Sequence, residues 1–280
     1  MISIITPVYN GEKFIEACIK AVIQQNCLDI EHIIVDGRSK DRTVEIVEHY
    51  AKQHSHIRWV SEPDQGQSDA LNKGIGLARG EVLSILNVDD YYEPGVLNRI
   101  VEIFKALPEP SFVVGNCNLW NQEGRIYKLN KPSKLRLYDL LLGYEVNPHP
   151  ANPSAYFYHT SLHQMIGLYD VDDHYTMDLE FICRAVQVAH VHYFNETWGN
   201  FQLHEESKTL TDSLSGQGKQ RREKVVADYR KKLPLIQQLV IRLEGMLYTR
   251  LPSSKYFLRY QKELIAKLRS KLKQKWQPAS

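Results

Sequence analysis

The chain has 280 residues, 43% of them hydrophobic and 24% charged, which is typical of a globular protein with one large domain and an appendage. Its four cysteines, Cys18, Cys27, Cys117 and Cys183, lie far apart without zinc-binding spacing, so we expect buried, reduced thiols. The sequence has no apolar run of about 18 residues and no basic segment before its apolar N-terminus, so neither a membrane-spanning helix nor a signal peptide is expected.

The net charge of +2 conceals an asymmetry along the chain. Residues 218–280 contain 17 lysines and arginines against four acidic residues, whereas residues 1–217 contain 18 against 29. This contrast predicts a catalytic body over 1–217 and a basic extension over 218–280.

The first hundred residues alternate between strand and helix patterns. The almost unbroken apolar run Ile2–Val8 predicts a buried parallel strand, and helical spacing of apolar residues over Glu12–Gln25 predicts a helix. The alternation continues through strands at 32–35, 57–61 and 82–86 and helices at 41–50 and 68–78. Such repeats favour an α/β fold with a parallel sheet and right-handed crossovers.

The remaining chain has a looser pattern. We expect strands at 112–115 and 190–194 and helices at 161–166 and 179–188. From about residue 220 the chain is expected to be helical, with breaks at Pro234 and Pro252.

Polar segments follow four of the predicted strands, at residues 6–10, 36–39, 64–69 and 87–90. Each alone could be an ordinary turn, because Asp, Asn and Gly are common turn residues. Ligands of open parallel sheets bind beyond the carboxyl ends of the strands, where all four segments would converge. The sequence therefore predicts a polar crevice rich in carboxylates.

Seven segments in order resemble the family-2 glycosyltransferases. They are TPVYNGEKFIEACIKAVIQQ, HIIVDGRSKDRT, SEPDQGQSDALNKGIGLARGE, LNVDD, NPHPANPSAYFY, GLYDVDDHYTMDLEFICRA and NFQLHEESKT. The resemblance implies a GT-A fold, with a Rossmann-like, mostly parallel sheet flanked by helices. Residues 1–100 would form the nucleotide-sugar-binding half and residues 101–217 the acceptor-side half.

The resemblance also implies a reaction. An inverting glycosyltransferase of this family, of the hexosyl or N-acetylhexosaminyl class, would move a sugar from a nucleotide sugar, here a UDP-sugar, to an acceptor hydroxyl. The product would be a polysaccharide, a lipopolysaccharide or another glycoconjugate. Asn87 stands where the family's Asp-x-Asp motif begins. This departure leaves open a catalytically silent nucleotide-sugar-binding or scaffolding protein on the same fold.

The departing nucleoside diphosphate requires neutralisation, and a divalent cation held by carboxylates provides it. Asp89 and Asp90 end a predicted strand and can present oxygens to Mn²⁺ or Mg²⁺, although which of them is the direct ligand stays open. Alternatively, the pair caps a helix that begins at Tyr91. By resemblance, His204 could complete the coordination shell, or it could be a structural residue.

The resemblance assigns further side chains to the donor. Asp36 would accept a hydrogen bond from the pyrimidine, and Arg38 would either reach a phosphate or point to solvent. Lys73 could instead be a plain surface lysine. The complete predicted donor set is Pro7, Tyr9, Asn10, Asp36, Arg38, Asp69, Asn72, Lys73, Asn87 and Asp89.

Attack at the anomeric carbon needs a base that deprotonates the acceptor hydroxyl, and a carboxylate can serve. In the family segment that YTMDLEFICRA resembles, the base corresponds to Asp178 and a second, more structural acid to Glu180. A single base without a nucleophile implies one displacement and inversion. His149 and Trp198 are further acceptor-side candidates, Trp198 either as a stacking wall or as a packing residue.

The extension contains two basic amphipathic patterns, Leu233–Leu251 and Lys255–Trp276. Such helices are typical of membrane surfaces, so we expect a cytoplasmic protein that is peripheral on the inner face of the membrane, near a lipid-linked acceptor. The helices could equally pack on the catalytic domain or on a second subunit. Nucleic acid is not an expected partner, because no binding module accompanies the charge.

Overall fold

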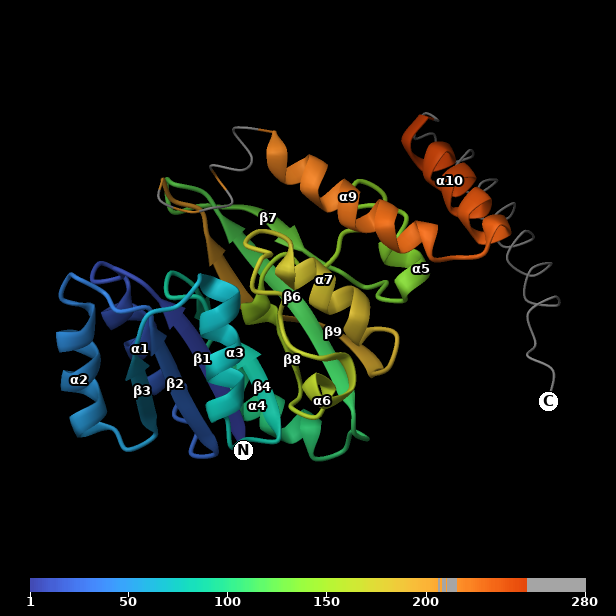
Figure 1. The fold of residues 1–280 in the computed structure, drawn as a ribbon. Coiled ribbons are helices and arrows are strands. Elements are labelled where there is room, and N and C mark those ends of the chain that lie inside the picture. Colours follow the sequence, from blue (N-terminus) through green and yellow to red (C-terminus); the bar gives the residue numbers. More distant parts are fainter. Residues whose placement is uncertain (206, 208–209, 211–215, 251–280) are drawn as a thin grey trace.

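The computed structural model describes residues 1–205, 207, 210 and 216–250. Its centre is a nine-stranded mixed sheet with the order β3-β2-β1-β4-β8-β6-β9-β5, in which β7 additionally pairs with β6. Helices flank this sheet, and two further helices lie beyond the half that contains β6 and β7 (Figure 1).

The first half is a parallel α/β unit, as the sequence predicts. Neighbouring strands β1, β2, β3 and β4 all pair in parallel. The elements, in chain order, are β1 (Ile2–Val8), α1 (Ile15–Ile23), β2 (Ile30–Asp36), α2 (Thr43–Gln53), β3 (Ile57–Ser61), α3 (Gln67–Leu77) and β4 (Val82–Ile85). Every residue of β1 and β2 is buried, which explains the apolar runs.

The second half adds strands of mixed direction. β8 lies antiparallel between β4 and β6, whereas β6 and β9 pair in parallel. The elements are β5 (Tyr91–Tyr92), α4 (Val96–Phe104), β6 (Ser111–Trp120), β7 (Ile126–Asn130), α5 (Leu137–Leu140), the 3-10 helix η1 (Pro153–Ala155), β8 (Tyr156–His159), α6 (Leu162–Ile166), α7 (Met177–Ala185) and β9 (His190–Gln202).

Two expectations of local structure are wrong in this half. Asp89 and Asp90 do not cap a helix, because β5 follows them directly and pairs with β9. β9 extends to Gln202, well past the predicted end at residue 194, because its C-terminal part pairs with both β6 and β5. The strand thereby carries the chain back toward the carboxyl end of β4.

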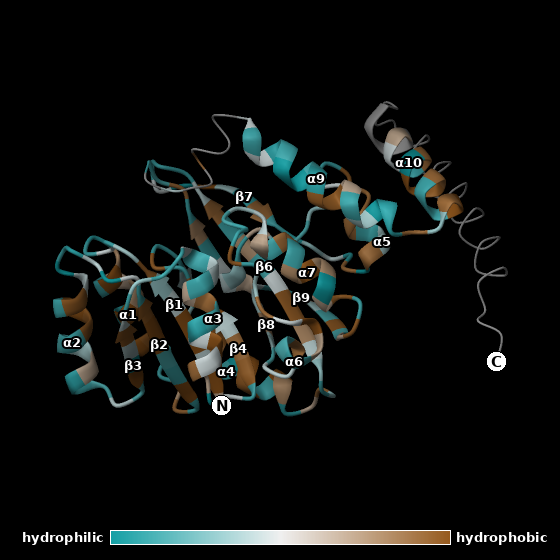
Figure 2. Cartoon of the chain, viewed as in Figure 1, coloured by the Kyte–Doolittle hydropathy of each residue, from teal (hydrophilic) through white to brown (hydrophobic). Residues whose placement is uncertain are grey.

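The two sheet faces bury separate clusters, because successive side chains of a strand point to opposite faces. Ile5 packs with side chains of α3 and α7, and the adjacent Ile4 packs with side chains of α1 and α4. Figure 2 shows the central strands as mostly hydrophobic, whereas the flanking helices carry both hydrophobic and hydrophilic residues. This arrangement leaves the carboxyl ends of the parallel strands uncovered by helix layers.

The first part of the basic extension packs on the body. Helix α9 (Gln217–Lys231) buries Val226 and Tyr229 in the cluster that contains α7, and α10 (Leu235–Arg250) buries Ile241 there. The Tyr229 hydroxyl donates a hydrogen bond of 2.9 Å to the Glu180 carboxylate. Pro234 separates the two helices, as expected.

The remaining predictions about the extension, the break at Pro252 and the amphipathic pattern over 255–276, lie outside the described residues. Among the described helices, none combines the length and the apolar character that crossing a membrane requires.

Candidate active site

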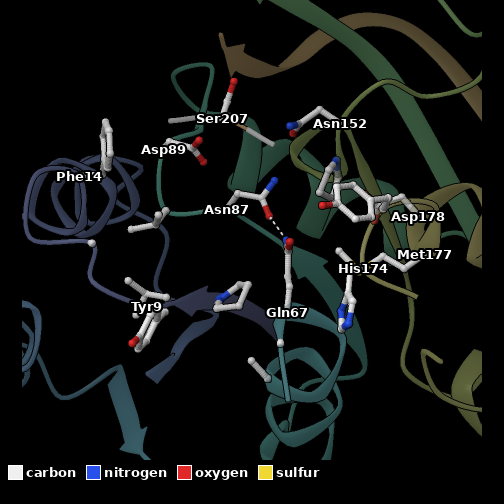
Figure 3. Close-up of a pocket in the computed structure, with 18 of the residues that line it drawn as sticks. Tyr9, Phe14, Gln67, Asn87, Asp89, Asn152, His174, Met177, Asp178 and Ser207 are labelled. Carbon is white, nitrogen blue, oxygen red and sulfur yellow. Dashed lines mark hydrogen bonds between the residues drawn. The ribbon is translucent and has the colours of Figure 1, made fainter. Parts of the chain in front are cut away.

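A cavity of about 500 Å³ opens at the carboxyl ends of β1 and β4. Seven of the predicted site residues line it: Pro7, Tyr9, Asn10, Asn87, Asp89, Asp178 and His204. Figure 3 shows Tyr9 and Phe14 on one side and Asp178, Met177 and His174 on the other, with Asn87 and Asp89 between them. Residues of the first, third and fourth polar segments thus meet in this cavity, whereas none of the second segment, 36–39, lines it.

Asp89 and His204 form a close pair in this cavity. One oxygen of Asp89 lies 2.7 Å from Nε2 of His204, and their side chains are 20% and 25% exposed. The His204 ring packs on Phe14, with 4.8 Å between ring centroids, and this contact fixes its orientation. The chain thus presents one carboxylate and one imidazole side by side to the cavity.

Asp90 does not join this pair, although it was a candidate metal ligand. Its side chain is only 2% exposed and accepts hydrogen bonds from Asn87 at 2.9 Å and Asn152 at 2.7 Å. Burial and then the charge of Asp89 raise the pKa of Asp90 well above its ordinary range. Asp90 therefore orients Asn87 and the loop at Asn152, and of these two adjacent acids Asp89 is the one that lines the cavity.

The Asp89–His204 pair fits a divalent cation that also binds a diphosphate. Carboxylate oxygen and imidazole nitrogen are ligands that Mn²⁺ accepts, and the ligand and water would supply the remaining positions. No cluster of three or more His, Cys, Asp or Glu residues suited to a metal occurs in the described part of the chain. A cation at this pair would therefore depend on ligand oxygens.

Asp178 lies in the first turn of α7 and reaches the cavity. The Tyr156 hydroxyl donates a hydrogen bond of 3.0 Å to its carboxylate, and no lysine or arginine among the described residues pairs with it. Burial raises the pKa of Asp178 to about 6, against the lowering effect of Tyr156. A carboxylate with this pKa is ionised at neutral pH and still accepts a proton readily.

The position of Asp178 depends on contacts between α3 and the segment before α7. The Ser68 hydroxyl donates a hydrogen bond of 2.8 Å to the Asp173 carbonyl. The Asn72 side-chain amide donates one of 2.9 Å to the Tyr169 carbonyl and accepts one of 2.9 Å from the Tyr169 backbone N–H. Asn72 is therefore occupied and does not line the cavity, so its predicted role at the donor finds no support in this geometry. One helical turn separates Ser68 from Asn72, so both join the two halves along one face of α3.

Two other predicted donor residues on α3 hold a loop. Lys73 pairs with Glu62 at 3.0 Å and donates 2.6 Å to the Pro63 carbonyl. Asp69 accepts from the Gln65 amide at 3.1 Å. Neither lines the cavity, so both support the segment that follows β3 rather than the ribose.

The predicted donor residue at the end of β2 is also engaged in hydrogen bonds within the protein. Asp36 is 1% exposed, and its carboxylate accepts hydrogen bonds from the Ser39 amide and hydroxyl and from the Ser61 hydroxyl. A carboxylate can accept about four hydrogen bonds, so these three leave room for one from a base, and it is the burial of Asp36 that limits access to it. Arg38 is exposed, has a left-handed φ of 64° and is not among the residues that line the cavity, which matches its solvent alternative.

The three acceptor-side candidates lie outside the cavity lining. Trp198 is 1% exposed and packs against Phe157 and Phe194, so it is a packing residue and not a stacking wall. Glu180 pairs with Arg184 at 2.6 Å and holds α9, which is a structural role. His149 is mostly enclosed and contacts the ring of Tyr144.

Sequence reasoning missed several cavity residues. Gln67 and Gly66 lie in the predicted polar segment 64–69, but neither was named as a site residue. Gln67 donates a hydrogen bond of 2.9 Å to the Asn87 side chain, and Gly66 adopts a left-handed φ of 124° against His174. Asn152 could have been found, because an Asn before a Pro is a helix-capping pattern and its side chain caps η1. Arg222 comes from α9, which was assigned to a separate extension, and no motif marks it.

Comparisons with known proteins bear on the family and the fold of the chain. The family model described as Glycosyl transferase family 2 matches residues 3–167. EpsJ of Bacillus subtilis, named an uncharacterized glycosyltransferase, is 41% identical over 122 residues, which are 44% of this chain and 35% of EpsJ. The chain thus spans about a third of that relative's length.

Two solved structures share the fold. S. aureus TarS in complex with UDP-GlcNAc superposes with a TM-score of 0.66 at 17% identity, covering 89% of this chain and 73% of that one. The mannosyltransferase PcManGT of Pyrobaculum calidifontis, in complex with GDP-Man and Mn²⁺, gives a TM-score of 0.54 at 15% identity, covering 98% and 87%. The predicted GT-A fold is confirmed. Because the family model matches more than half of the 280 residues of this chain, the chain belongs to glycosyl transferase family 2.

Proposed function

We propose that the chain is an inverting, cation-dependent glycosyltransferase that moves a hexosyl or N-acetylhexosaminyl group from a UDP-sugar to an acceptor hydroxyl. The observation that carries this proposal is the arrangement in one cavity of the Asp89–His204 pair with Asp178. A donor diphosphate at the pair would place its sugar toward Asp178 across the width of the cavity. The context would be polysaccharide, lipopolysaccharide or other glycoconjugate synthesis.

Asp178 would act as the base. Its carboxylate takes the proton of the acceptor hydroxyl while that oxygen attacks the anomeric carbon, and the bond from this carbon to the diphosphate oxygen breaks. The bonding electrons leave with the nucleoside diphosphate. Because the acceptor attacks opposite to the leaving group in one displacement, the anomeric configuration inverts. The Tyr156 hydroxyl keeps the carboxylate oriented before and after the transfer.

Asp89 and His204 would hold Mn²⁺ or Mg²⁺ together with the donor. When bound, the cation supplies positive charge that offsets the charge of the departing diphosphate. Tyr9, 58% exposed at the rim, offers a ring face to the base beside Pro7 and Asn10. The solved complexes of TarS with UDP-GlcNAc and of PcManGT with GDP-Man and Mn²⁺ support a donor of this chemical class.

The experiment that tests this function is nucleotide release. The full chain is incubated with UDP-GlcNAc, UDP-glucose, UDP-galactose or GDP-mannose and Mn²⁺, with and without simple sugar acceptors, and the nucleoside diphosphate is quantified. We expect release with at least one UDP-sugar and none in EDTA. Asp89→Asn and Asp178→Asn should both abolish turnover, whereas only Asp89→Asn should weaken UDP binding.

Asp172→Asn is the matched control, because Asp172 is an exposed acid in the same segment that lies outside the cavity lining. Binding of a UDP-sugar to the wild type without release under any condition would favour the catalytically silent alternative. Release that is insensitive to Asp178→Asn would refute Asp178 as the base.

We also propose that the protein acts at the cytoplasmic membrane surface, through α10. Leu235, Leu239 and Leu243 are four residues apart along this helix and are 76%, 58% and 57% exposed, and Ile236 beside them is 61% exposed. The apolar residues of α10 stand out on its ribbon in Figure 2. The sequence that follows, residues 251–280, carries eight lysines and arginines against one acidic residue, which favours an anionic membrane as the partner.

A further inference from the structure

Arg222 gives the cavity a positive charge that the reaction described above does not use. Three carboxylates line the cavity, those of Asp64, Asp89 and Asp178, and Arg222 is the single lysine or arginine among the described lining residues. It forms no ion pair with any described carboxylate, although such partners line the same cavity. An arginine in this situation is available to an anion that enters from solution.

Helix α9 holds Arg222 in place. Arg222, Val226 and Tyr229 are spaced four and three residues apart and therefore lie on one face of the helix. Val226 and Tyr229 are buried against the body, and the Tyr229 hydroxyl bonds Glu180 at 2.9 Å. Because these contacts fix the helix face, they also direct the base of the Arg222 side chain toward the cavity.

Arg222 belongs to a basic and aromatic cluster with Lys128, Tyr144 and His149. The Arg222 guanidinium lies 5.9 Å from the Tyr144 ring centroid, and the Lys128 ammonium lies 5.2 Å from the same centroid. The His149 ring lies 4.8 Å from that of Tyr144. Lys128 is exposed and, like Arg222, forms no ion pair with a described carboxylate. The cluster therefore carries two positive charges that pair with no carboxylate among the described residues.

His149 adds no charge to this cluster. Its enclosure, and to a smaller degree the nearby Arg222, lower the pKa of His149 to about 4, so the ring is neutral at physiological pH. Asn130 bonds the backbone of His149 and Ala151 at 3.2 and 3.1 Å. The same loop continues to Ala151 and Asn152 in the cavity lining, so the cluster and the cavity share one wall.

Three members of the cluster, Lys128, Tyr144 and His149, belong to the predicted acceptor-side half, and α9 brings Arg222 to them. All four members come from residues 128–222, the part that also supplies Asp178, whereas Tyr9 and Phe14 on the opposite side come from the segment between β1 and α1. Building on the proposed function, we propose that the acceptor is an anionic glycan or glycolipid whose phosphate or carboxylate binds Arg222, with Lys128 on the same aromatic ring as a second positive charge, while its hydroxyl meets Asp178.

The test uses the full chain loaded with UDP and Mn²⁺, so that the diphosphate site is already filled. Glucose 6-phosphate, glucuronate and neutral glucose are titrated in turn and followed by ligand-observed NMR. We expect both anions to bind more tightly than glucose. Arg222→Gln should weaken the anions at least about tenfold, the range for loss of a charge-assisted hydrogen bond, and leave glucose unchanged.

Lys224→Gln is the matched control, because it removes the same charge from the same helix at an exposed position outside the cavity lining. Tighter binding of glucose 6-phosphate than of glucuronate would identify a phosphorylated acceptor, and the reverse a uronic acid. Equal effects of Arg222→Gln and Lys224→Gln, or no binding of either anion to the wild type, would overturn the proposal.

UDP binding to each variant is measured first. If Arg222→Gln weakens UDP rather than the anionic sugars, Arg222 serves the donor diphosphate and the acceptor proposal is wrong. If the wild type binds no UDP at all, the proposed function fails, and this result is distinct from a wild type that binds UDP but no anionic sugar.

Discussion

Replacing Asp178 by Asn should inactivate the protein and at the same time stabilise it. The carboxyl has a pKa of about 6 in the folded chain and an ordinary value of 3.8, because burial disfavours its charge. Since one pKa unit corresponds to about 1.4 kcal/mol, the ionised carboxylate lowers the free energy of unfolding by up to about 3 kcal/mol. Asn removes the charge and still accepts the Tyr156 hydrogen bond.

The sign follows from proton linkage. The folded chain binds the proton more tightly than the unfolded chain, so the wild type gains stability as the pH falls from about 6 to about 4. The advantage of Asp178→Asn is therefore greatest above pH 6. We expect the free energy of unfolding of Asp178→Asn to exceed that of the wild type by up to about 3 kcal/mol at pH 8 and by about half of that at pH 5.

Urea unfolding at both pH values measures this difference, with Asp172→Asn as the control that should change little at either pH. Transfer activity should fall on the order of 10² to 10⁴-fold in Asp178→Asn. Wild-type activity should decline as the pH falls below about 6, because the base becomes protonated. A destabilised Asp178→Asn at pH 8, or an equal effect at both pH values, would refute the reasoning.

Three further predictions concern other parts of the chain. UDP should bind more weakly in EDTA than in Mn²⁺, by titration calorimetry, and Asp89→Asn should remove this difference; equal affinities in the wild type would contradict the cation site. Gly115→Ala should lower the free energy of unfolding by about 1–3 kcal/mol, because the added methyl group would overlap the indole ring of Trp198. Gly76→Ala, where nothing lies within 4 Å, serves as its control in urea unfolding. Leu239→Gln combined with Leu243→Gln should reduce co-sedimentation with anionic vesicles, and unchanged sedimentation would argue against α10 as a docking surface.

Much of the architecture follows from local sequence. The apolar run at Ile2–Val8 can only be satisfied by burial on both faces, which requires helices on both sides of a parallel sheet. The polar residues after β1 and β4 then meet at one edge, because parallel strands end there together. Asp89, Asp178 and His204 could therefore be placed in one cavity from order, spacing and family resemblance.

Side-chain direction could not be predicted in the same way. Asp89 and Asp90 are adjacent and chemically identical, and only the packing of β9 and the loop at Asn152 decides that Asp90 is buried. These partners lie 62 and 112 positions away along the sequence. Asn72 likewise looks like a ligand residue until the Tyr169 backbone occupies it.

The extension shows the same division. Its charge and amphipathic spacing are properties of the sequence, and they predict helices with apolar faces. Spacing alone does not say which body those faces contact, because any apolar surface could bury them. The tertiary structure decides that Val226 and Tyr229 pack against α7, and this packing brings Arg222 to the cavity. Composition and periodicity thus determine the elements, whereas contacts between distant segments determine which polar side chains face the ligand.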